Sequence, residues 1–257
     1  MNLYVKKYVV ENEKKRIFIV HGICEHSKRY ENLAVKLNKE GFSVVTYDLR
    51  GHGKSEGKKG YIKKYTDHIE DLDRIIKEND NKAVKRYIIG HSLGGLIGHL
   101  YMVNNTEDID GFIASGAPTN YLKNVKPLRI IGYKWIGFIN TKNNFGKNAL
   151  SKDKKVEEEY QNDPLVLKKF KIRLAGEMFV KGVKNLKKKI STNNKPILIL
   201  HGKEDKIVPK EFSEKVYELI NHEQKTLHIY DDMYHEIFNE ITKDIPINDV
   251  ISWLNKN

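Results

Sequence analysis

The sequence Gly-His-Ser-Leu-Gly at residues 90–94 places a serine between two glycines, at the junction of a strand-like run and a helix-like run. Residues 84–89 are rich in β-branched and aromatic side chains, and the apolar residues of 96–103 recur at helical spacing. A sharp strand-to-helix turn leaves no room for a Cβ two residues before or after the serine, which accounts for the glycines. The pattern predicts that Ser92 projects over a sheet edge at a helix N-terminus, where developing negative charge is favoured.

A serine becomes a nucleophile at neutral pH only with the help of a base and an orienting acid. A buried-strand pattern at 196–202 runs into a loop that contains Asp205, and an alternating pattern at 225–230 runs into a loop that contains His235. We predict that His235 is the base and Asp205 the acid of a catalytic triad. Three further carboxylates lie near these positions and stay open as alternatives for the acid: Glu204, Asp231 and Asp232.

The chain order serine, acid, histidine is that of the α/β-hydrolase fold. Strand-like and helix-like runs alternate from residue 15 to 116, which favours a mostly parallel central sheet with right-handed crossovers and flanking helices. The alternation of strand-like and helix-like runs stops at 118–190, where the pattern predicts helices and loops. A strand pattern resumes at Pro196. We therefore expect an α/β-hydrolase core formed by residues 1–117 and 191–257, with a helical cap inserted at 118–190.

The negative charge of an acyl-transfer transition state needs backbone donors. One donor should be the N–H of Leu93, the residue after the nucleophile, and the other should come from the loop after an early strand. Residues 16–20 form such a strand and lead into a loop in which Ile23 is the second donor by position. Gly22 would let the main chain approach the reacting carbon.

The cap region contains two segments that could line a tunnel for an acyl chain. Residues 128–139 are strongly apolar, and residues 172–183 are amphipathic. The same side chains could equally serve only to pack the cap onto the core. The candidates for substrate contact are Trp135, Ile136, Phe138, Met178 and Phe179.

Several motifs in this order resemble the monoacylglycerol lipase and lysophospholipase group of serine α/β-hydrolases along nearly the whole chain. They are His-Gly-Ile-Cys-Glu-His-Ser-Lys-Arg-Tyr at 21–30, Asp-Leu-Arg-Gly-His-Gly-Lys-Ser-Glu-Gly at 48–57, the elbow at 90–95, Asn-Asp-Pro-Leu at 162–165, and His-Glu at 235–236 with Asn-Glu at 239–240. The resemblance implies hydrolysis of an ester of a single acyl chain, most simply a monoacylglycerol or a lysophospholipid. Ile23 and Cys24 are larger than the residues usual there, which bears on substrate size.

Other functions share the same predicted catalytic residues. A carboxylesterase or acyltransferase for small esters, a cofactor-free perhydrolase, and a weakly catalytic ligand receptor stay open. Dehalogenases and epoxide hydrolases need an aspartate at the elbow, where this chain has Ser92. We expect no metal and no cofactor.

Charge and cysteine content bear on partners and location. The net charge of +12 comes mainly from scattered lysines without a nucleic-acid-reading motif, so we expect no nucleic-acid partner. Lysines at 168–171 and 184–189 lie in the expected cap, so transient contact with an anionic membrane surface stays open beside a general compositional excess of lysine. A single cysteine, no signal-like N-terminus and no run of about 20 apolar residues predict a cytoplasmic protein, peripheral to the membrane at most.

Overall fold

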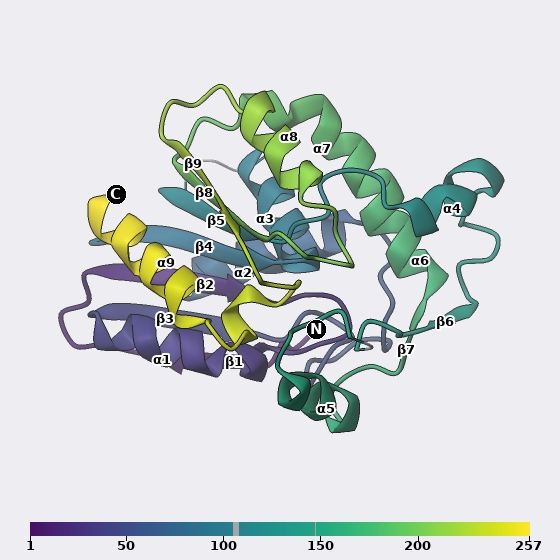
Figure 1. Cartoon of the computed structure of the whole chain (residues 1–257), viewed down its shortest axis with the longest axis horizontal. Coiled ribbons are helices and arrows are strands. Elements are labelled where there is room, and N and C mark those ends of the chain that lie inside the picture. The colour runs from purple at the N-terminus through teal and green to yellow at the C-terminus, as the bar shows by residue number, and fades with distance from the viewer. Residues whose placement is uncertain (105–107, 147) are drawn as a thin grey trace.

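A seven-stranded sheet runs through the centre of the computed structural model, which describes residues 1–104, 108–146 and 148–257 (Figure 1). Its order is β1-β3-β2-β4-β5-β8-β9. β1 pairs antiparallel with β3, and the other neighbours pair in parallel. The strands are β1 (Val5–Tyr8), β2 (Lys15–Val20), β3 (Phe42–Tyr47), β4 (Lys85–His91), β5 (Gly111–Ser115), β8 (Ile197–Gly202) and β9 (Lys225–Tyr230).

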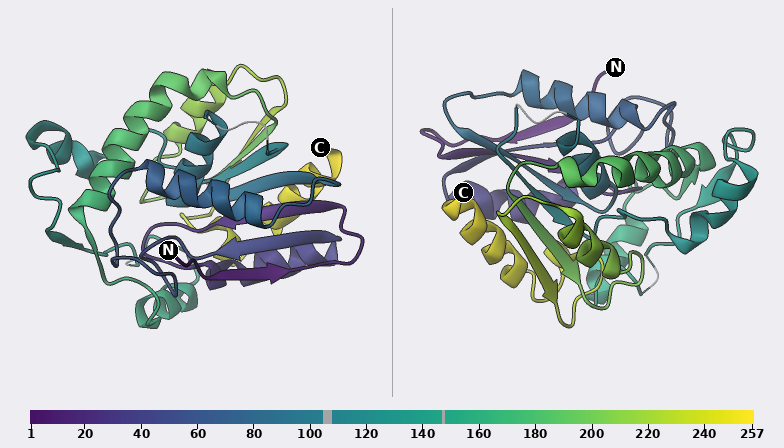
Figure 2. Two further views of the ribbon diagram at one scale, coloured as in Figure 1. Left: turned by 180° about the vertical axis from the view of Figure 1, so that it is seen from behind. Right: turned by 90° about the horizontal axis from the view of Figure 1, so that it is seen from above.

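Helices cover both faces of this sheet, because alternate strand residues point to opposite sides and both sides are apolar (Figure 2). On one face, Phe18 and Val20 of β2 belong to the core cluster that contains side chains of α2 (Thr66–Glu78), α3 (Leu93–Met102) and α8 (Glu211–Leu219). On the other face, Ile17 and Ile19 pack with α1 (Glu31–Lys39) and α9 (Asp244–Lys256). The α/β-hydrolase architecture expected from the sequence is confirmed.

The chain between β5 and β8 includes residues 118–190, here called the inserted segment; its part from α4 to α6 lies beyond the carboxyl ends of these strands, whereas α7 packs against α3 (Figure 1). The sequence predicted only helices and loops there, but β6 and β7 form an antiparallel pair. Each of these strands has three residues, too few to show a periodic pattern. The elements are η2 (Lys123–Val125), α4 (Lys126–Ile131), β6 (Asn140–Lys142), α5 (Lys154–Asn162), β7 (Lys169–Lys171), α6 (Ile172–Ala175), the π-helix η3 (Gly176–Gly182), α7 (Val183–Lys189) and η4 (Ile190–Thr192).

Two short 3₁₀ helices flank the site described below. They are η1 (Ser27–Tyr30), which leads into α1, and η5 (Ile237–Asn239), which follows the loop after β9. None of the helices in the described parts of the chain combines the length and apolar character needed to cross a bilayer.

Candidate active site

Ser92 occupies a strained turn between β4 and α3, as the glycine pattern predicts. Its φ of 53° and ψ of −117° lie outside the regions that L-residues ordinarily adopt. Its N–H donates to the carbonyl of Ser115 at 2.8 Å, which joins the turn to the end of β5. A Cβ on Gly90 or Gly94 would overlap backbone atoms, so this turn requires glycine at both positions.

Asp205 and His235 meet at the same edge of the sheet, although they follow different strands. His235 Nδ1 lies 2.6 Å from Asp205 Oδ2, and both side chains are buried. The imidazole of His235 packs against that of His91, the neighbour of Ser92, with the ring centres 4.6 Å apart. The structure therefore brings the predicted acid, base and nucleophile into one cluster at the ends of β4, β8 and β9.

The charges of this pair shift both of its pKa values. Burial disfavours the ionised form of Asp205, but the charge of His235 and hydrogen bonds from His201 and His235 outweigh it and hold the pKa of Asp205 well below its usual range. Burial also disfavours a charged His235, yet the charge and hydrogen bond of Asp205 raise the pKa of His235 above its ordinary value. An ionised aspartate facing a histidine of raised basicity is the arrangement of a general base.

The alternative carboxylates bind lysines at the surface instead. Lys152 Nζ lies 2.9 Å from Glu204 and 3.2 Å from Asp232. Lys203 Nζ lies 2.7 Å from Asp231. The side chains of Glu204, Asp231 and Asp232 are all exposed, so Asp205 is the carboxylate that the fold presents to His235.

The loop after β2 lies beside Ser92. A Cβ on Gly22 would lie 3.1 Å from Ser92 Cβ and 2.7 Å from Glu25 Oε1, so the close approach requires glycine. Cys24 has a φ of 67°, in the left-handed region. Its carbonyl accepts a 2.8 Å hydrogen bond from the N–H of Leu167, which ties the loop to the inserted segment.

Buried charged side chains hold the loop after β2 in place. The Glu25 carboxylate accepts from the N–H of Gly22 at 2.5 Å and from the hydroxyl of Tyr30 at 2.7 Å. The guanidinium of Arg29 donates to Glu25 at 3.2 Å and also binds Glu236, the neighbour of the candidate base. Burial and the nearby charge of Glu236 raise the pKa of Glu25 to about 7. The network thus joins the candidate oxyanion loop to the candidate histidine loop.

The two predicted oxyanion donors flank the serine. Leu93 is the first residue of α3, so its N–H has no partner within the helix. Ile23 lines the same cavity as Ser92. The other bulky residue of the loop, Cys24, is buried in the core instead of lining that cavity.

A cavity of about 290 Å³ opens at Ser92 between the sheet and the inserted segment. Within the described ranges its lining includes no charged side chain. The lining residues are Ile23, Ser92, Pro118, Leu122, Asn124, Val125, Pro127, Leu128, Thr141, Phe145, Phe170, Ile172, Ala175, Phe179, Ile207 and Val208.

Only one of the five cap residues expected to contact substrate lines this cavity. Phe179 does so from the π-helix, whereas Met178 is fully buried in the core cluster. Ile136 is partly buried but does not line the cavity. Trp135 and Phe138 are 88% and 70% exposed, because the chain after α4 runs along the surface instead of continuing as a packed helix.

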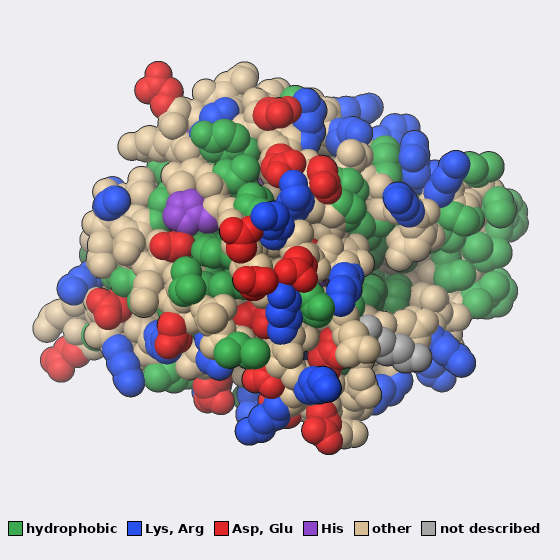
Figure 3. All heavy atoms as spheres, in the orientation of Figure 1, with side chains coloured by type: hydrophobic (Ala, Val, Ile, Leu, Met, Phe, Trp, Pro, Cys, Tyr) green, Lys and Arg blue, Asp and Glu red, His purple; other side chains and the backbone are tan. Residues whose placement is uncertain are grey.

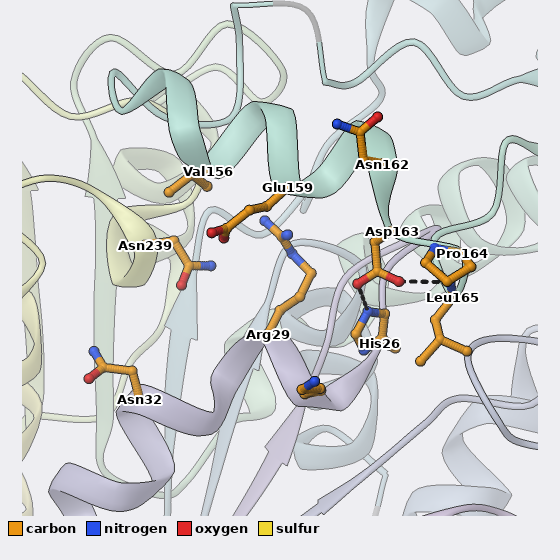
Figure 4. A pocket seen from close by; sticks show the side chains of 11 residues that line it. His26, Arg29, Asn32, Val156, Glu159, Asn162, Asp163, Pro164, Leu165 and Asn239 are labelled. Atoms are coloured by element: carbon orange, nitrogen blue, oxygen red, sulfur yellow. Dashed lines mark hydrogen bonds and ion pairs between the residues drawn. The ribbon is translucent and has the colours of Figure 1, made fainter.

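A second, more open cleft of about 640 Å³ lies between α5 and the start of α1 (Figure 4). It contains none of the three candidate catalytic residues. At its wall His26 Nε2 lies 2.9 Å from Asp163 Oδ2, and Asp163 also accepts from the N–H of Leu165. The Asn-Asp-Pro-Leu motif at 162–165 thus attaches the inserted segment to the loop after β2.

The sequence analysis missed one buried histidine beside the candidate acid. His201 Nε2 lies 3.1 Å from Asp205 Oδ2, on the side away from any solvent. The available signal was its spacing, four residues before Asp205 at the end of an apolar strand pattern. The described residues contain no cluster of three or more potential ligands placed to hold a metal ion.

Comparison with known proteins bears on the fold and the class of enzyme. A monoacylglycerol lipase of Mycolicibacterium smegmatis is 28% identical over 244 residues, covering 93% of this chain and 87% of its own. The phospholipase YtpA of Bacillus subtilis is 26% identical, covering 87% of this chain and 88% of its own. The crystal structure of a monoacylglycerol lipase from Paleococcus ferrophilus superposes with a TM-score of 0.89 at 29% identity, covering 99% and 98% of the two chains.

The family described as serine aminopeptidase, S33 (Hydrolase_4) matches residues 11–242, almost the entire length of the chain. The fold, the turn at Ser92 and the family match all indicate the same class of enzyme. The chain therefore belongs to the Hydrolase_4 family and is a serine hydrolase of the α/β-hydrolase fold.

Proposed function

We propose that this protein hydrolyses the ester of a single acyl chain, most simply a monoacylglycerol, through an acyl-enzyme on Ser92. The observation that carries the proposal is the uncharged, mainly apolar cavity that opens at the Ser92 side chain. Such a lining favours an alkyl chain, since each buried methylene contributes about 0.8 kcal/mol. Relatives named monoacylglycerol lipase and phospholipase support the same substrate class.

In the proposed mechanism His235 takes the hydroxyl proton of Ser92 as the oxygen attacks the ester carbonyl. Asp205 orients the imidazole, and the N–H groups of Ile23 and Leu93 stabilise the oxyanion. His235 then gives the proton to the leaving alcohol, which leaves an acyl group on Ser92. Water, deprotonated by His235, attacks this acyl group; the bond to Ser92 Oγ breaks, His235 returns the proton to that oxygen, and the fatty acid is released.

The lining also supports a choice of headgroup. A phosphate would need Arg or Lys to replace its hydration, and an amino-acid substrate of an aminopeptidase would need a carboxylate for its ammonium group. Neither kind of side chain lines the cavity in the described parts of the chain. We therefore place a neutral glycerol ester ahead of a lysophospholipid or a peptide.

The size of the cavity sets the expected chain length. Its volume of about 290 Å³ lies at the small end of ligand pockets. We expect medium-chain monoacylglycerols to be the best substrates.

We also propose that residues 118–190 act as a cap that contacts an anionic membrane surface. Hydrophobic side chains gather at the end of the molecule formed by α4 and the chain after it, with basic residues close by (Figure 3). α4 supplies Pro127 and Leu128 to the cavity, while Ile130 and Ile131 of the same helix are 75% and 73% exposed. The exposed apolar residues of this cap patch are Ile130, Ile131, Trp135, Phe138 and Ile139. A patch of this kind beside a lipid cavity is suited to a membrane interface.

The test of hydrolysis is a turnover panel of monoacylglycerols, lysophospholipids, short nitrophenyl esters and an aminoacyl nitroanilide. We expect monoacylglycerols to have the highest kcat/KM, and the variant Ser92→Ala to lose about 10⁴- to 10⁶-fold in kcat together with labelling by a fluorophosphonate probe. Turnover of short esters alone would refute the lipase assignment. Equal labelling of wild type and Ser92→Ala would refute the mechanism.

The test of membrane contact is co-sedimentation with phosphatidylcholine vesicles that contain or lack phosphatidylglycerol. Trp135→Ala and Ile131→Ala should reduce binding to the anionic vesicles. Ile241→Ala is the matched control, because Ile241 is 68% exposed but lies outside the inserted segment. Equal binding by all three variants would contradict the role of the cap patch.

A further inference from the structure

Three hydrogen bonds hold the carboxylate of Asp205, and a fourth nitrogen, Nε2 of His201, lies beside it. Its Oδ1 accepts from the N–H groups of Ile207 and Val208 at 2.8 and 2.9 Å. Its Oδ2 faces His235 Nδ1 at 2.6 Å and His201 Nε2 at 3.1 Å. Hydrogen bonds on both oxygens, with His201 packed beside Oδ2, restrict the plane of the carboxylate, and that plane orients the His235 ring.

The surroundings of His201 identify which of its nitrogens carries a proton. Nε2 lies 3.1 Å from Asp205 Oδ2 and 2.9 Å from the carbonyl oxygen of Val208. Both neighbours are acceptors when Asp205 is ionised, so Nε2 must carry the hydrogen, which it donates to the Val208 carbonyl while facing Asp205 Oδ2. Nδ1 lies 2.7 Å from the hydroxyl of Ser213 on α8, which can donate to it. The ring is thus fixed from the side of α8, in a fully buried position.

We propose that His201 is a positioning residue for the hydrolysis, acting through Asp205 as a second histidine on the catalytic acid; this inference rests on the proposed function. His235 uses Asp205 to orient its imidazole, while His201 holds the opposite side of the same oxygen. The loop that carries Asp205 follows β8, and the contact of His201 with Asp205 and its hydrogen bond to the Val208 carbonyl span that loop. Without His201 the carboxylate keeps its three hydrogen bonds, but its plane is less firmly fixed against His235.

The experiment compares two variants of His201 in the full chain. His201→Leu fills a similar space without a donor, and His201→Gln keeps an N–H that can reach Asp205. We expect His201→Leu to lower kcat about ten- to hundredfold with KM within about twofold, as for the loss of a hydrogen bond to a buried charge. His201→Gln should recover most of that loss.

The pH profile separates positioning from a merely structural role. The groups that face His235 are Asp205, Glu236, Glu25 and the ring of His91, and the His201 variants leave all four in place. Loss of a neutral donor leaves the negative charge of Asp205 less compensated, which raises the pKa of His235. The acid limb of kcat/KM should therefore move to higher pH in His201→Leu. A variant that only unfolds more easily would lower the number of active sites without moving that limb.

Active sites are counted by fluorophosphonate labelling, and kcat is expressed per labelled site. The control is His228→Leu, because His228 also binds an aspartate, Asp249 at 2.9 Å, but at the half-exposed far edge of the sheet. We expect it to match wild type. If His201→Leu has the same kcat per labelled site and the same acid limb as wild type, the inference about His201 is wrong, while the proposed hydrolysis is unaffected. Absence of ester turnover by wild type would instead refute the proposed function.

Discussion

His26 on the loop after β2 and Asp163 on the inserted segment are joined, Nε2 to Oδ2, at 2.9 Å (Figure 4). With the bond from Leu167 N–H to the Cys24 carbonyl, this contact attaches the inserted segment to the loop that carries Ile23. We expect Asp163→Ala to lower kcat severalfold, because the candidate oxyanion donor is then less well fixed. Steady-state kinetics together with limited proteolysis between 118 and 190 would measure the effect.

The control for this prediction is Asp249→Ala. Asp249 pairs with His228 at the same distance of 2.9 Å but far from the cavity. Equal kcat for both variants would show that the contact between His26 and Asp163 serves folding alone.

Phe179 should limit the length of the acyl chain. It lines the cavity from the π-helix, so Phe179→Ala deepens the space above Ser92. Each further methylene that enters is worth about 0.8 kcal/mol, or roughly fourfold in kcat/KM. We expect the preferred monoacylglycerol to become longer, as measured with a homologous series below micelle concentration. Trp135→Ala, at a residue that is 88% exposed and outside the lining, should leave the preference unchanged.

Turnover should require Asp205 and not the adjacent Glu204. Asp205→Asn should lower kcat about 10⁴-fold, because an amide favours the wrong tautomer of His235. Glu204→Gln should keep nearly normal kcat, since Glu204 binds Lys152 at the surface. Near-normal turnover by Asp205→Asn would mean that another carboxylate is the acid.

Buried histidines should make the protein lose stability as the pH falls below about 6.5. Burial lowers the pKa of His99 to about 3, and burial together with nearby charges places those of His21 and His52 at about 3 and 4. The unfolded chain binds a proton at each position below its ordinary pKa, while the native chain stays neutral. The free energy of unfolding should therefore fall by about 1.4 kcal/mol per pH unit for each such histidine between about 6 and 4.

His99 offers the simplest test of this effect, because burial alone lowers its pKa, beside the ring of Phe112. Urea unfolding of His99→Leu from pH 7 to 4.5 should show a slope smaller by about 1.4 kcal/mol per pH unit than that of wild type. His222→Leu, at a partly exposed position, serves as the control. Identical slopes for wild type and His99→Leu would exclude a contribution from this residue.

The strands of the sheet could be predicted wherever they are buried on both faces or show a clear alternation of apolar and polar residues. The patterns at 16–20, 196–202 and 225–230 match β2, β8 and β9 to within one residue. The short edge strand β1 escaped detection, because its four residues Val-Lys-Lys-Tyr are only partly buried and carry little apolar signal. The pair β6 and β7 escaped for the same reason.

The site could be predicted where a backbone constraint leaves a mark on the sequence. Glycine spacing located Ser92, and strand ends located Asp205 and His235. The wall of the cavity could not be found in this way, because apolar residues pack the core and line a pocket with equal ease. Met178 and Phe179 are neighbours, yet one is buried in the core and the other lines the cavity. His201 was missed because its role depends on a partner that only the turn after β8 brings near.

The pairing of β5 with β8 closes the sheet across the inserted segment, from Phe112 with Ile197 to Ser115 with Leu200. During synthesis the segment that contains Ser92 is therefore made before the strands that lead to the proposed acid and base. At about 5–20 residues per second, the ribosome delivers His235 several seconds after Ser92. A nascent chain thus holds an unassisted, weakly reactive serine, and esterase activity begins only when the last two strands join the sheet.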